Sequence, residues 1–584
     1  MNREFLRARL PGLGPWAAAV IVVVAVGGCG GSDDDDDDQP SAAAPLRCDQ
    51  MAGLTVPAAS IGLPTTGATV TAAEVVPAGG TGAKTFGEYC RVSAEINPVD
   101  SNAPKIKMQL ALPANWNRKA MMFGGGGYNG TIPNVAGNVP AGPTNQPDPI
   151  GRGYATFASN SGHEGASNQG AFAVNDEALR NFAFEALKKT RDTAVHLINK
   201  RYAADPERSY FAGGSTGGRE ALAVTQKWPR DFNGAIVLYP AYNAATLDLQ
   251  IGRVTRALAA PGAYPNLNKR RALYDAAIQA CDGLDGAQDG LISNQAACDA
   301  SFNPDTATLN GQPLRCPGGA DTGDTCLSDA QIGAMKVINT PINIPYRLAS
   351  GETQYPGYTT WGTDFGRPGT GVQATVNYLG LNTVAPTSPM PPPPAASAPG
   401  IPYHSAFWDQ WVKFFVTRDP NFDSLTIDPE RPGVWEARIS ALTGLQDVNR
   451  TDLSEFESRG GKILMAHGIH DQLVSNRATQ QYYQRIRATM GAPRTAGFLR
   501  YYEIPGYSHA FSTVFNAAWD SLTALENWVE RGAAPAGQVV ADTAGVPGRT
   551  RPLCEYPAWP QYRGTGDLNA AASYACADSA IRTQ

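Results

Sequence analysis

The stretch SYFAGGSTGGRE, residues 209–220, decides the predicted fold of this chain. Residues 209–213 form a short apolar strand, Gly213-Gly214-Ser215-Thr216-Gly217 follows the pattern G-x-S-x-G, and residues 218–227 continue as a helix. The glycines permit a tight turn that a side chain would obstruct, and this turn lifts the Ser215 hydroxyl clear of the sheet. An ordinary glycine-rich turn is the alternative, since the chain has 62 glycines. The strand and the helix on either side favour a nucleophilic serine.

The segments on both sides of this stretch alternate short apolar strands with helices. Apolar residues recur at helical spacing over residues 175–200. The other predicted strands are residues 119–123 (KAMMF), 154–158 (YATFA), 234–238 (GAIVL), 462–466 (KILMA) and 500–504 (RYYEI). This alternation is typical of a parallel sheet with crossover helices, so the predicted class is α/β.

The alternation stops between about residues 245 and 445. That segment contains cysteine-bearing loops, an acidic glycine-rich turn and the run PMPPPP at residues 389–394. The sequence therefore predicts an α/β-hydrolase fold with a large inserted lid domain. Residues 48–244 and 446–584 would form the catalytic domain, and residues 245–445 would form a lid over the active site.

The first residues are typical of an export signal. Arg3, Arg7 and Arg9 precede an apolar run at residues 17–26, and Val26-Gly27-Gly28-Cys29 resembles a bacterial lipobox. We expect residues 1–29 to be a lipoprotein-type signal peptide with a lipid anchor on Cys29. Residues 30–47, which include six consecutive aspartates, would be a flexible acidic tether. A plain secretory signal, in which Cys29 is removed, is the alternative. Either way we expect an outer-membrane lipoprotein or a periplasmic or extracellular protein.

Composition and cysteine content support an exported globular protein. A net charge of −6 and a pI near 5.6 argue against nucleic acid as a partner, because phosphate binding needs a basic face. Of the nine cysteines, setting Cys29 aside leaves an even set of eight, which predicts disulfides in an oxidising compartment. The sequence leaves their connectivity open. Pairing neighbours closes the shortest loops, and we expect that pairing: 48–90, 281–298, 316–326 and 554–576.

A nucleophilic serine needs a base and a group that orients the base, and in this fold the chain order is serine, acid, histidine. His509 follows the last predicted strand in IPGYSH, and Asp471 follows the preceding strand in AHGIHD. Both come just after strand ends that meet at one edge of the sheet. The predicted triad is therefore Ser215, Asp471 and His509. The competitors are His467 and His470, which precede the last strand, Glu503, which lies inside a strand, and His196, which lies on a helix.

Two backbone N–H groups must stabilise the oxyanion of acyl transfer. We expect one from Thr216, directly after the nucleophile, and one from the loop FGGGGYNG at residues 123–130. Gly127 is the predicted donor of this loop, with Gly126 next. A phosphate-binding loop is the alternative, but no Lys-Ser/Thr pair follows the glycines.

The acidic turn CDGLDGAQDGL, residues 281–291, is a candidate metal site. Three carboxylates alternate with glycines, and the carbonyls of Ala287 and Leu291 are available, a set that suits a hard ion such as calcium. The spacing is not that of an EF-hand. A solvated acidic turn is the alternative. Cys281 and Cys298 would close the loop with a disulfide, which favours a structural ion away from the chemistry.

Together these motifs resemble the tannase/feruloyl esterase family, which includes enzymes like mono-(2-hydroxyethyl) terephthalate hydrolase. The resemblance runs from about Cys48 to Cys576. It rests on GGGGYNG, NSGHEG, GGSTGGRE, CDGLDGAQDGLI, HGIHD, PGYSH, RTRPLCEYP and GTGDLNAAASYAC. It implies a serine carboxylic-ester hydrolase for esters of aromatic acids of the feruloyl, galloyl or terephthaloyl type. It also implies one structural calcium in the lid, held by Asp282, Asp285, Ala287 O, Asp289 and Leu291 O.

One departure from the family pattern lies beside the predicted triad. Members of the family typically carry a cysteine directly before the nucleophile and another directly after the histidine, joined in a disulfide. Here those positions are Gly214 and Ala510. We hypothesise that packing around these two residues replaces the covalent tie.

The sequence does not assign the substrate-binding residues. Seven aromatic side chains of the predicted lid could stack on an aromatic ring or could equally form the lid core. They are Trp361, Phe365, Tyr378, Phe407, Trp408, Trp411 and Phe414. Three rival functions also stay open, namely a peptidase or a general aliphatic or aryl esterase on the same scaffold, and a non-catalytic surface binding protein.

Overall fold

A ten-stranded mixed sheet forms the centre of the computed structural model, which describes residues 44–577. The predicted site residues follow parallel strands of this sheet. They therefore lie at the edge where the carboxyl ends of those strands meet. The strands, in spatial order, are β1 (Thr55–Val56), β2 (Ala68–Val76), β3 (Tyr89–Ile96), β4 (Ile106–Pro113), β6 (Ala155–Ser159), β5 (Lys119–Phe123), β7 (Arg208–Gly214), β8 (Gly234–Leu238), β13 (Lys462–Gly468) and β14 (Leu499–Ile504).

The predicted strands are confirmed, and their bounds shift by at most two residues. β6, β5, β7, β8, β13 and β14 run parallel to one another, as the alternation of strands and helices predicts. The antiparallel β1–β4 part was not predicted. Much of β2 is exposed, so its sequence ATVTAAEVV carries no continuous apolar run.

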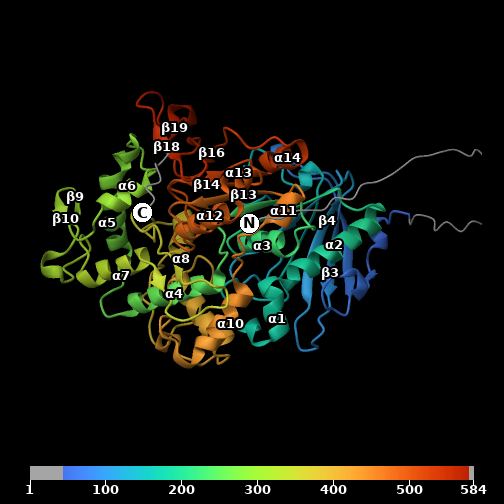
Figure 1. The fold of residues 1–584 in the computed structure, drawn as a ribbon, viewed down its shortest axis with the longest axis horizontal. Coiled ribbons are helices and arrows are strands. Elements are labelled where there is room, and N and C mark those ends of the chain that lie inside the picture. The colour runs from blue at the N-terminus through green and yellow to red at the C-terminus, as the bar shows by residue number, and fades with distance from the viewer. Residues whose placement is uncertain (1–43, 578–584) are drawn as a thin grey trace, which may run out of the picture. The chain divides into compact units, whose positions relative to one another are not determined.

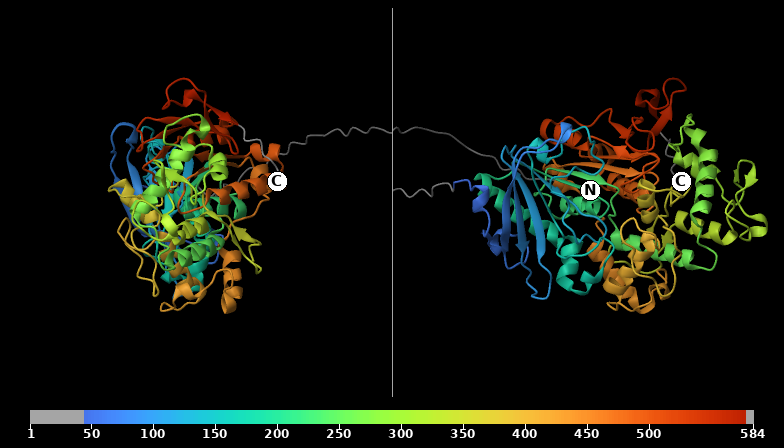
Figure 2. Two further views of the ribbon diagram at one scale, coloured as in Figure 1. Left: turned by 90° about the vertical axis from the view of Figure 1, so that its left-hand side faces the viewer. Right: turned by 180° about the vertical axis from the view of Figure 1, so that it is seen from behind.

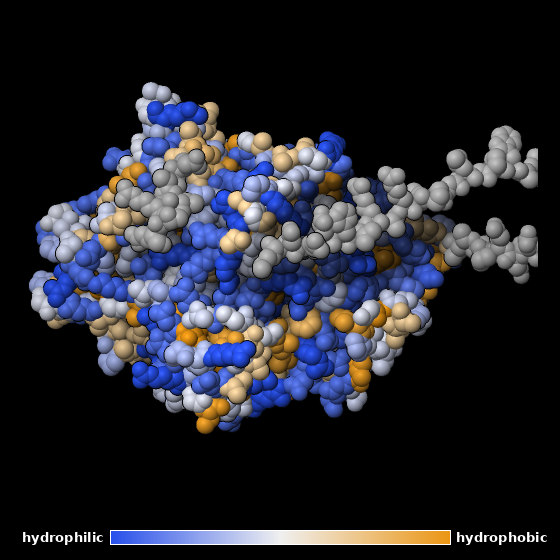
Figure 3. Space-filling view, in the orientation of Figure 1, coloured by the Kyte–Doolittle hydropathy of each residue, from blue (hydrophilic) through white to orange (hydrophobic). Residues whose placement is uncertain are grey.

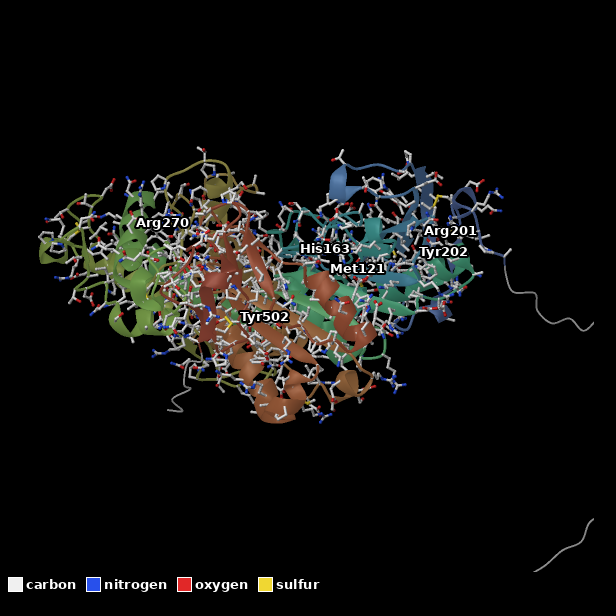
Figure 4. The ribbon with its side chains drawn as sticks, turned by 90° about the horizontal axis from the view of Figure 1, so that it is seen from above. Met121, His163, Arg201, Tyr202, Arg270 and Tyr502 are labelled. Atoms are coloured by element: carbon white, nitrogen blue, oxygen red, sulfur yellow. A yellow bond between two sulfur atoms is a disulfide. The ribbon has the colours of Figure 1, made fainter. Side chains whose placement is uncertain are left out.

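Successive side chains of the parallel strands enter two different cores, one on each face of the sheet. In β8, Ala235 and Val237 belong to one core, and Ile236 and Leu238 belong to the other. The first core is covered by α2 (Ala186–Tyr202), α3 (Thr216–Lys227) and α12 (Asn476–Met490); the second is covered by α14 (Ser521–Arg531). Met121 of β5 and Tyr502 of β14, which are labelled in Figure 4, belong to the second core.

The helix predicted over residues 175–200 is present but interrupted. It consists of α1 (Asp176–Arg180), a π-helical turn (Asn181–Glu185) and α2, and the Asn175 side chain accepts a hydrogen bond from the backbone N–H of Ala178 at its start. At its end, the Tyr202 hydroxyl donates to the carbonyl of Pro113 at 2.7 Å, which fastens α2 to β4 (Figure 4).

Residues 239–461 form an insertion between β8 and β13 that adds no strand to the main sheet. Its elements are α4 (Ala244–Ala259), α5 (Leu267–Cys281), α6 (Gln295–Ser301), β9 (Thr308–Leu309), β10 (Gln312–Pro313), α7 (Asp329–Asn339), β11 (Ile342–Asn343), β12 (Gln354–Tyr355), α8 (Val372–Leu379), α9 (Tyr403–Gln410), α10 (Glu436–Gln446) and α11 (Ser454–Ser458). The helices α5, α6 and α7 of this insertion lie on the side of the fold that is farthest from β3 (Figures 1 and 2).

A buried arginine fastens the loops of this insertion. Arg270 of α5 donates to the carbonyl of Phe365 at 2.7 Å and to that of Asn382 at 2.5 Å (Figure 4). The predicted bounds of the lid, residues 245–445, and its role as a lid stay predictions.

The expected pairing of neighbouring cysteines is present in the structure. Disulfides join Cys48 to Cys90, Cys281 to Cys298, Cys316 to Cys326, and Cys554 to Cys576. The last one lies in the C-terminal segment, whose elements are α13 (Ala492–Ala496), β15 (Ala517–Ala518), β16 (Val539–Asp542), β17 (Thr550–Pro552), β18 (Trp559–Tyr562) and β19 (Tyr574–Ala577). Such a set of disulfides is typical of proteins that mature in an oxidising compartment.

No helix within residues 44–577 is sufficiently long and apolar to cross a membrane. The face shown in Figure 3 is mostly hydrophilic, with hydrophobic residues scattered over it. The predicted signal peptide with Cys29, and residues 30–43 of the predicted tether, lie outside the described residues.

Candidate active site

Ser215 lies on a sharp turn between β7 and α3. Its φ of 59° and ψ of −124° are unfavourable for a residue with a side chain, and its N–H donates to the carbonyl of Leu238 at 3.1 Å. A Cβ atom on Gly213 would lie 2.2 Å from the carbonyl oxygen of Gly217, and one on Gly217 would lie 2.8 Å from that of Gly125. The turn therefore requires glycine at both positions, as the motif predicts.

Asp471 and His509 follow the neighbouring parallel strands β13 and β14 and meet at the edge of the sheet. Asp471 Oδ2 lies 2.8 Å from His509 Nδ1, and both side chains are buried. The backbone N–H of His509 donates to the side-chain oxygen of Gln472 at 3.1 Å, and those of Leu473 and Val474 each donate to Asp471 Oδ1 at 2.8 Å. The carboxylate is thus held in one orientation, and with it the imidazole.

The electrostatics of this pair keep Asp471 ionised. Burial by itself raises the pKa of Asp471, but the charge and hydrogen bond of His509, together with the hydrogen bond of His467, hold that pKa well below its usual range. An ionised, fully bonded carboxylate fixes the proton of His509 on Nδ1, which leaves Nε2 to accept a proton.

The competing residues are placed differently. His467 contacts Asp471 Oδ2 at 3.2 Å through Nε2 and Thr479 at 2.9 Å through Nδ1, so both ring nitrogens are occupied. His470 Nδ1 accepts from the N–H of Gly506 at 3.0 Å, and burial lowers the pKa of His470 to about 4. Glu503 lies in β14 and binds Asn476 and Gln480, and His196 lies on α2.

The glycine loop after β5 comes to the start of α3. The Thr216 hydroxyl donates to the carbonyl of Gly127 at 2.6 Å, which ties the two predicted oxyanion donors together. Gly127 has a φ of +56°, and a Cβ atom there would lie 2.2 Å from the carbonyl oxygen of Ser167. Within the described residues, the N–H groups of Gly127 and Thr216 have no acceptor in the backbone and side-chain hydrogen bonds of these loops. Both N–H groups are therefore available as hydrogen-bond donors, and their oxyanion role stays a prediction.

Sequence reasoning missed the residue that anchors this loop. Glu220 of α3 is buried, accepts from the N–H of Gly125 at 2.9 Å, and accepts from the side-chain amide of Asn129 at 2.7 Å. The signal is an acidic residue five positions after the nucleophile, on a helix that is buried from Thr216 to Gln226. Its role becomes visible only when the loop is packed against it.

The space beside Gly214 is filled by an aromatic ring. A Cβ atom on Gly214 would lie 2.6 Å from ring carbons of Tyr239, and the centroid of that ring lies 4.8 Å from the centroid of His509. The hydroxyl of Tyr507 donates to the carbonyl of Ala510 at 3.2 Å. The Tyr239 ring thus lies between Gly214 and the histidine loop, and Ala510 is bound within that loop to Tyr507. That this packing replaces the covalent tie stays a hypothesis.

A cavity beside Ser215 is walled mainly by apolar and aromatic side chains. Tyr128 and Phe407 stack there, with ring centroids 3.7 Å apart. The lining residues are Gly127, Tyr128, Phe182, Ser215, Thr216, Arg219, Ala241, Ala244, Leu247, Asp248, Ile251, Tyr403, Phe407, Gln446, Leu473 and Val474. Of the seven lid aromatics singled out in the sequence, only Phe407 lines this cavity. Trp408 and Trp411 are fully buried in the first core.

A larger cleft, of about 290 Å³, lies elsewhere on the described surface. It is lined by polar residues such as Asn476, Gln480 and Arg477, and Ser215 and His509 are not among its lining residues. The smaller cavity beside Ser215 is the one that carries the predicted chemistry.

The acidic turn uses most of its carboxylate oxygens internally. Asp282 accepts from the N–H of Gly290 at 2.9 Å, Asp285 accepts from those of Ala287 and Ser293, and Asp289 binds the Arg551 guanidinium and the Tyr574 hydroxyl. Within the described residues, no three His, Cys, Asp or Glu side chains are grouped as a metal site. The turn still offers only oxygen donors, which are the ligands that a hard cation takes. Burial raises the pKa of Asp285 to about 6.

Comparison with known proteins agrees with this geometry. The family model described as "Tannase and feruloyl esterase" matches residues 90–577. The chain belongs to the tannase and feruloyl esterase family. It is therefore a carboxylic ester hydrolase with the α/β-hydrolase fold, as predicted.

Individual relatives span most of the chain. An uncharacterized esterase of Agrobacterium fabrum is 38% identical over 541 residues, which cover 91% of this chain and 93% of the relative. Mono(2-hydroxyethyl) terephthalate hydrolase of Piscinibacter sakaiensis is 31% identical, with coverage of 84% and 85%. The crystal structure of feruloyl esterase B from Aspergillus oryzae shares the fold, with a TM-score of 0.69, 24% identity and coverage of 88% and 98%.

Proposed function

We propose that this chain hydrolyses esters of aromatic acids, of the feruloyl, galloyl or terephthaloyl type, through an acyl-enzyme on Ser215. The observation that carries the proposal is the buried Asp471–His509 pair. These two residues follow β13 and β14, which run parallel to β7, the strand that leads into the Ser215 turn. Leu473 and Val474, two and three residues after Asp471, line the same cavity as Ser215. The Tyr239 ring contacts both His509 and the position beside Ser215.

The chemistry proceeds in two steps of acyl transfer. Ser215 Oγ attacks the ester carbonyl while His509 Nε2 takes its proton, and Asp471 stabilises the resulting imidazolium. The N–H groups of Gly127 and Thr216 stabilise the tetrahedral oxyanion. His509 then protonates the leaving alcohol. Water, deprotonated by His509, attacks the acyl-enzyme, and the acid and free Ser215 are released.

The cavity supports an aromatic acyl group. Tyr128 and Phe407 form a stacked wall, and Phe182 and Tyr403 also line the space next to Ser215. The relatives include mono(2-hydroxyethyl) terephthalate hydrolase and a probable feruloyl esterase of Aspergillus terreus. Both kinds of substrate are esters of flat aromatic acids.

Product release from four esters tests the proposal: methyl ferulate, methyl gallate, mono-(2-hydroxyethyl) terephthalate and p-nitrophenyl acetate. The mature chain from about residue 41 would be used. We expect an aromatic-acid ester to be turned over with a higher kcat/KM than p-nitrophenyl acetate. Activity on p-nitrophenyl acetate alone would favour a general esterase. No product release from any of the four esters, together with no labelling by a fluorophosphonate probe, would favour a non-catalytic binding protein.

We also propose a structural calcium ion at the acidic turn, held by Asp282, Asp285 and Asp289 with the carbonyls of Ala287 and Leu291. The support is the oxygen-only donor set and the desolvated carboxylates. Calcium would stabilise the join between α5 and α6 and take no part in the chemistry, and its binding would require Asp289 to exchange its contact with Arg551.

A thermal-unfolding series tests the calcium proposal. The pKa of Asp285 is raised to about 6 by burial, so in calcium-free protein this group lowers stability as the pH rises from about 4 to about 6. At pH 7 we expect calcium at a hundredfold excess over its Kd to raise Tm by roughly 2–3 °C. The shift should shrink at pH 4 and be lost in Asp285→Asn, with magnesium as the matched ion. No shift, and no calcium by elemental analysis, would contradict the site.

Export of the chain agrees with its disulfides. A lipid anchor on Cys29 stays a prediction, because that residue lies outside the described residues.

A further inference from the structure

Four consecutive glycines, residues 124–127, form the loop after β5 and include the predicted oxyanion donor Gly127. Glycine has more conformational freedom than any other residue, so such a run needs contacts from elsewhere in the fold to adopt a single shape. An oxyanion donor is effective only when it already lies where the developing charge requires it. The groups that hold this run of glycines therefore decide how well Gly127 can act.

Glu220 of α3 contacts both ends of the turn that contains Gly127. Its Oε2 accepts from the N–H of Gly125 at 2.9 Å, and its Oε1 accepts from the side-chain amide of Asn129 at 2.7 Å. The N–H of Asn129 donates to the carbonyl of Gly126 at 2.8 Å, which closes the turn. One carboxylate thus bridges the two ends of the turn and encloses Gly127.

The groups that face Glu220 match an ionised carboxylate. A backbone N–H and an amide NH2 can only donate, whereas an ionised carboxylate can only accept. Burial raises the pKa of Glu220, and the positive charge of Arg219 and the two hydrogen bonds oppose that rise. Glu220 is 2% exposed, so water has little access to replace either hydrogen bond.

The glycines allow Glu220 and Asn129 to approach the loop backbone closely. A Cβ atom on Gly124 would lie 2.9 Å from Glu220 Oε2 and 2.6 Å from the Cα atom of Gly217. A Cβ atom on Gly125 would lie 2.1 Å from Asn129 Oδ1. The loop therefore requires glycine at both positions because the bridge packs directly against its backbone.

The segment NSGHEG, residues 160–165, holds the end of the same turn. The Asn129 amide, which donates one hydrogen to the carboxylate, also donates to the hydroxyl of Ser161 at 2.7 Å. The N–H of Gly130 donates to the carbonyl of Asn160 at 3.3 Å. This segment, which the sequence singles out without a role, thus orients the amide that completes the bridge.

We propose that Glu220 is a positioning residue for ester hydrolysis, and that its bridge between Gly125 and Asn129 sets the direction of the Gly127 N–H in the oxyanion hole. This inference rests on the proposed function. Glu220 is not among the residues that line the cavity beside Ser215, so it acts through the turn. Loss of the bridge should therefore weaken binding of the tetrahedral intermediate more than binding of the ester.

Glu220→Gln tests the bridge with little change in the size of the side chain. Glutamine can accept at only one of the two positions, and its NH2 group would face a donor at the other. We expect kcat to fall by about tenfold to a hundredfold, with KM changed less than about threefold. The rate of labelling by a fluorophosphonate, whose phosphonyl oxygen would occupy the oxyanion hole, should fall by a similar factor.

The double variant Glu220→Gln/Asn129→Asp exchanges the two groups of the bridge. The glutamine NH2 can then donate to the new carboxylate, while the glutamine oxygen still accepts from the N–H of Gly125. We expect the kcat of the double variant to exceed that of Glu220→Gln by at least about fivefold. Asn129→Asp alone sets two carboxylates against each other and should lower kcat by more than about tenfold.

Glu177→Gln is the matched control for a buried carboxylate. Glu177 is 4% exposed and accepts from the N–H groups of Val99 and Asp100 at 3.1 and 2.7 Å. We expect Glu177→Gln and Glu220→Gln to lower Tm by similar amounts, and Glu177→Gln to keep kcat within about threefold of the wild type. Ser161→Ala removes the other acceptor of the Asn129 amide and should lower kcat by about threefold to tenfold. It decides the test if Glu220→Gln fails to fold.

The contrary outcomes are distinct. A kcat of Glu220→Gln within about threefold of the wild type overturns the inference, as does an equal loss in Glu177→Gln or a loss confined to KM. A double variant that keeps the wild-type Tm and shows no recovery of kcat also overturns it. If the wild type hydrolyses an ester and reacts with a fluorophosphonate, any of these results leaves the proposed function intact. Absence of both wild-type signals would mean that the proposed function itself fails.

Discussion

Replacing Ser215 by alanine is expected to lower kcat by about 10⁴-fold to 10⁶-fold, because the acyl-enzyme can no longer form. The N–H groups of Gly127 and Thr216 remain in this variant, so a small rate above that of water is expected to survive. The fold should be unaffected, since Ser215 keeps its backbone hydrogen bond to Leu238 and alanine takes up less space. Turnover of the best ester and labelling by a fluorophosphonate probe are the measurements.

Ser209→Ala is the matched control for this variant. Ser209 lies on the same strand, β7, and is bound to Asn233 through its backbone N–H. We expect full activity and full labelling in Ser209→Ala. Substantial turnover by Ser215→Ala with an unchanged melting temperature would assign the nucleophile to another residue.

Replacing Asp471 by asparagine is expected to lower kcat by about 10⁴-fold while KM changes little. The asparagine amide would place an N–H where the ionised carboxylate accepts from His509 Nδ1 at 2.8 Å. His509 would then adopt the wrong tautomer, with its proton on Nε2, and could not take the proton of Ser215. A pH profile of kcat, compared with that of the wild type, measures the loss of the base.

The second histidine on Asp471 supplies the control. His467 contacts the same carboxylate oxygen at 3.2 Å, but it is held by Thr479 and does not lie in the chain order of the triad. His467→Gln should cost about tenfold or less, because the Asp471–His509 hydrogen bond remains. An equal loss in His467→Gln and Asp471→Asn would assign the orienting role to the whole cluster rather than to Asp471 acting on His509.

Local sequence patterns were sufficient for the parallel strands and for the positions of Ser215, Asp471 and His509. Short apolar runs such as residues 234–238 are buried on both faces of the sheet. A few consecutive apolar residues are therefore enough to predict such a strand. The chain order of the three site residues follows from the order of the strands that carry them. The glycines of the Ser215 turn indicate a tight backbone conformation that residues with side chains rarely adopt.

The anchoring and packing residues could not be predicted in this way. Glu220, Tyr239 and Phe407 act through partners that lie far away in the chain, and such contacts leave no local period. The exposed strand β2 also escaped prediction, because an edge region with one solvated face needs few apolar residues.

The sequence by itself determined the fold class, the turn that carries Ser215, the order of the site residues and, with Cys29 set aside, an even set of eight cysteines. Only the tertiary structure decided which aromatic rings line the cavity beside Ser215 and what occupies the space beside Gly214. It also decided which groups the carboxylates of the acidic turn bind. It also placed Asp248 and Gln446, nearly two hundred positions apart in the chain, in one cavity. The physical reason is that backbone conformation is set by neighbouring residues, whereas the composition of a cavity depends on how separate elements pack.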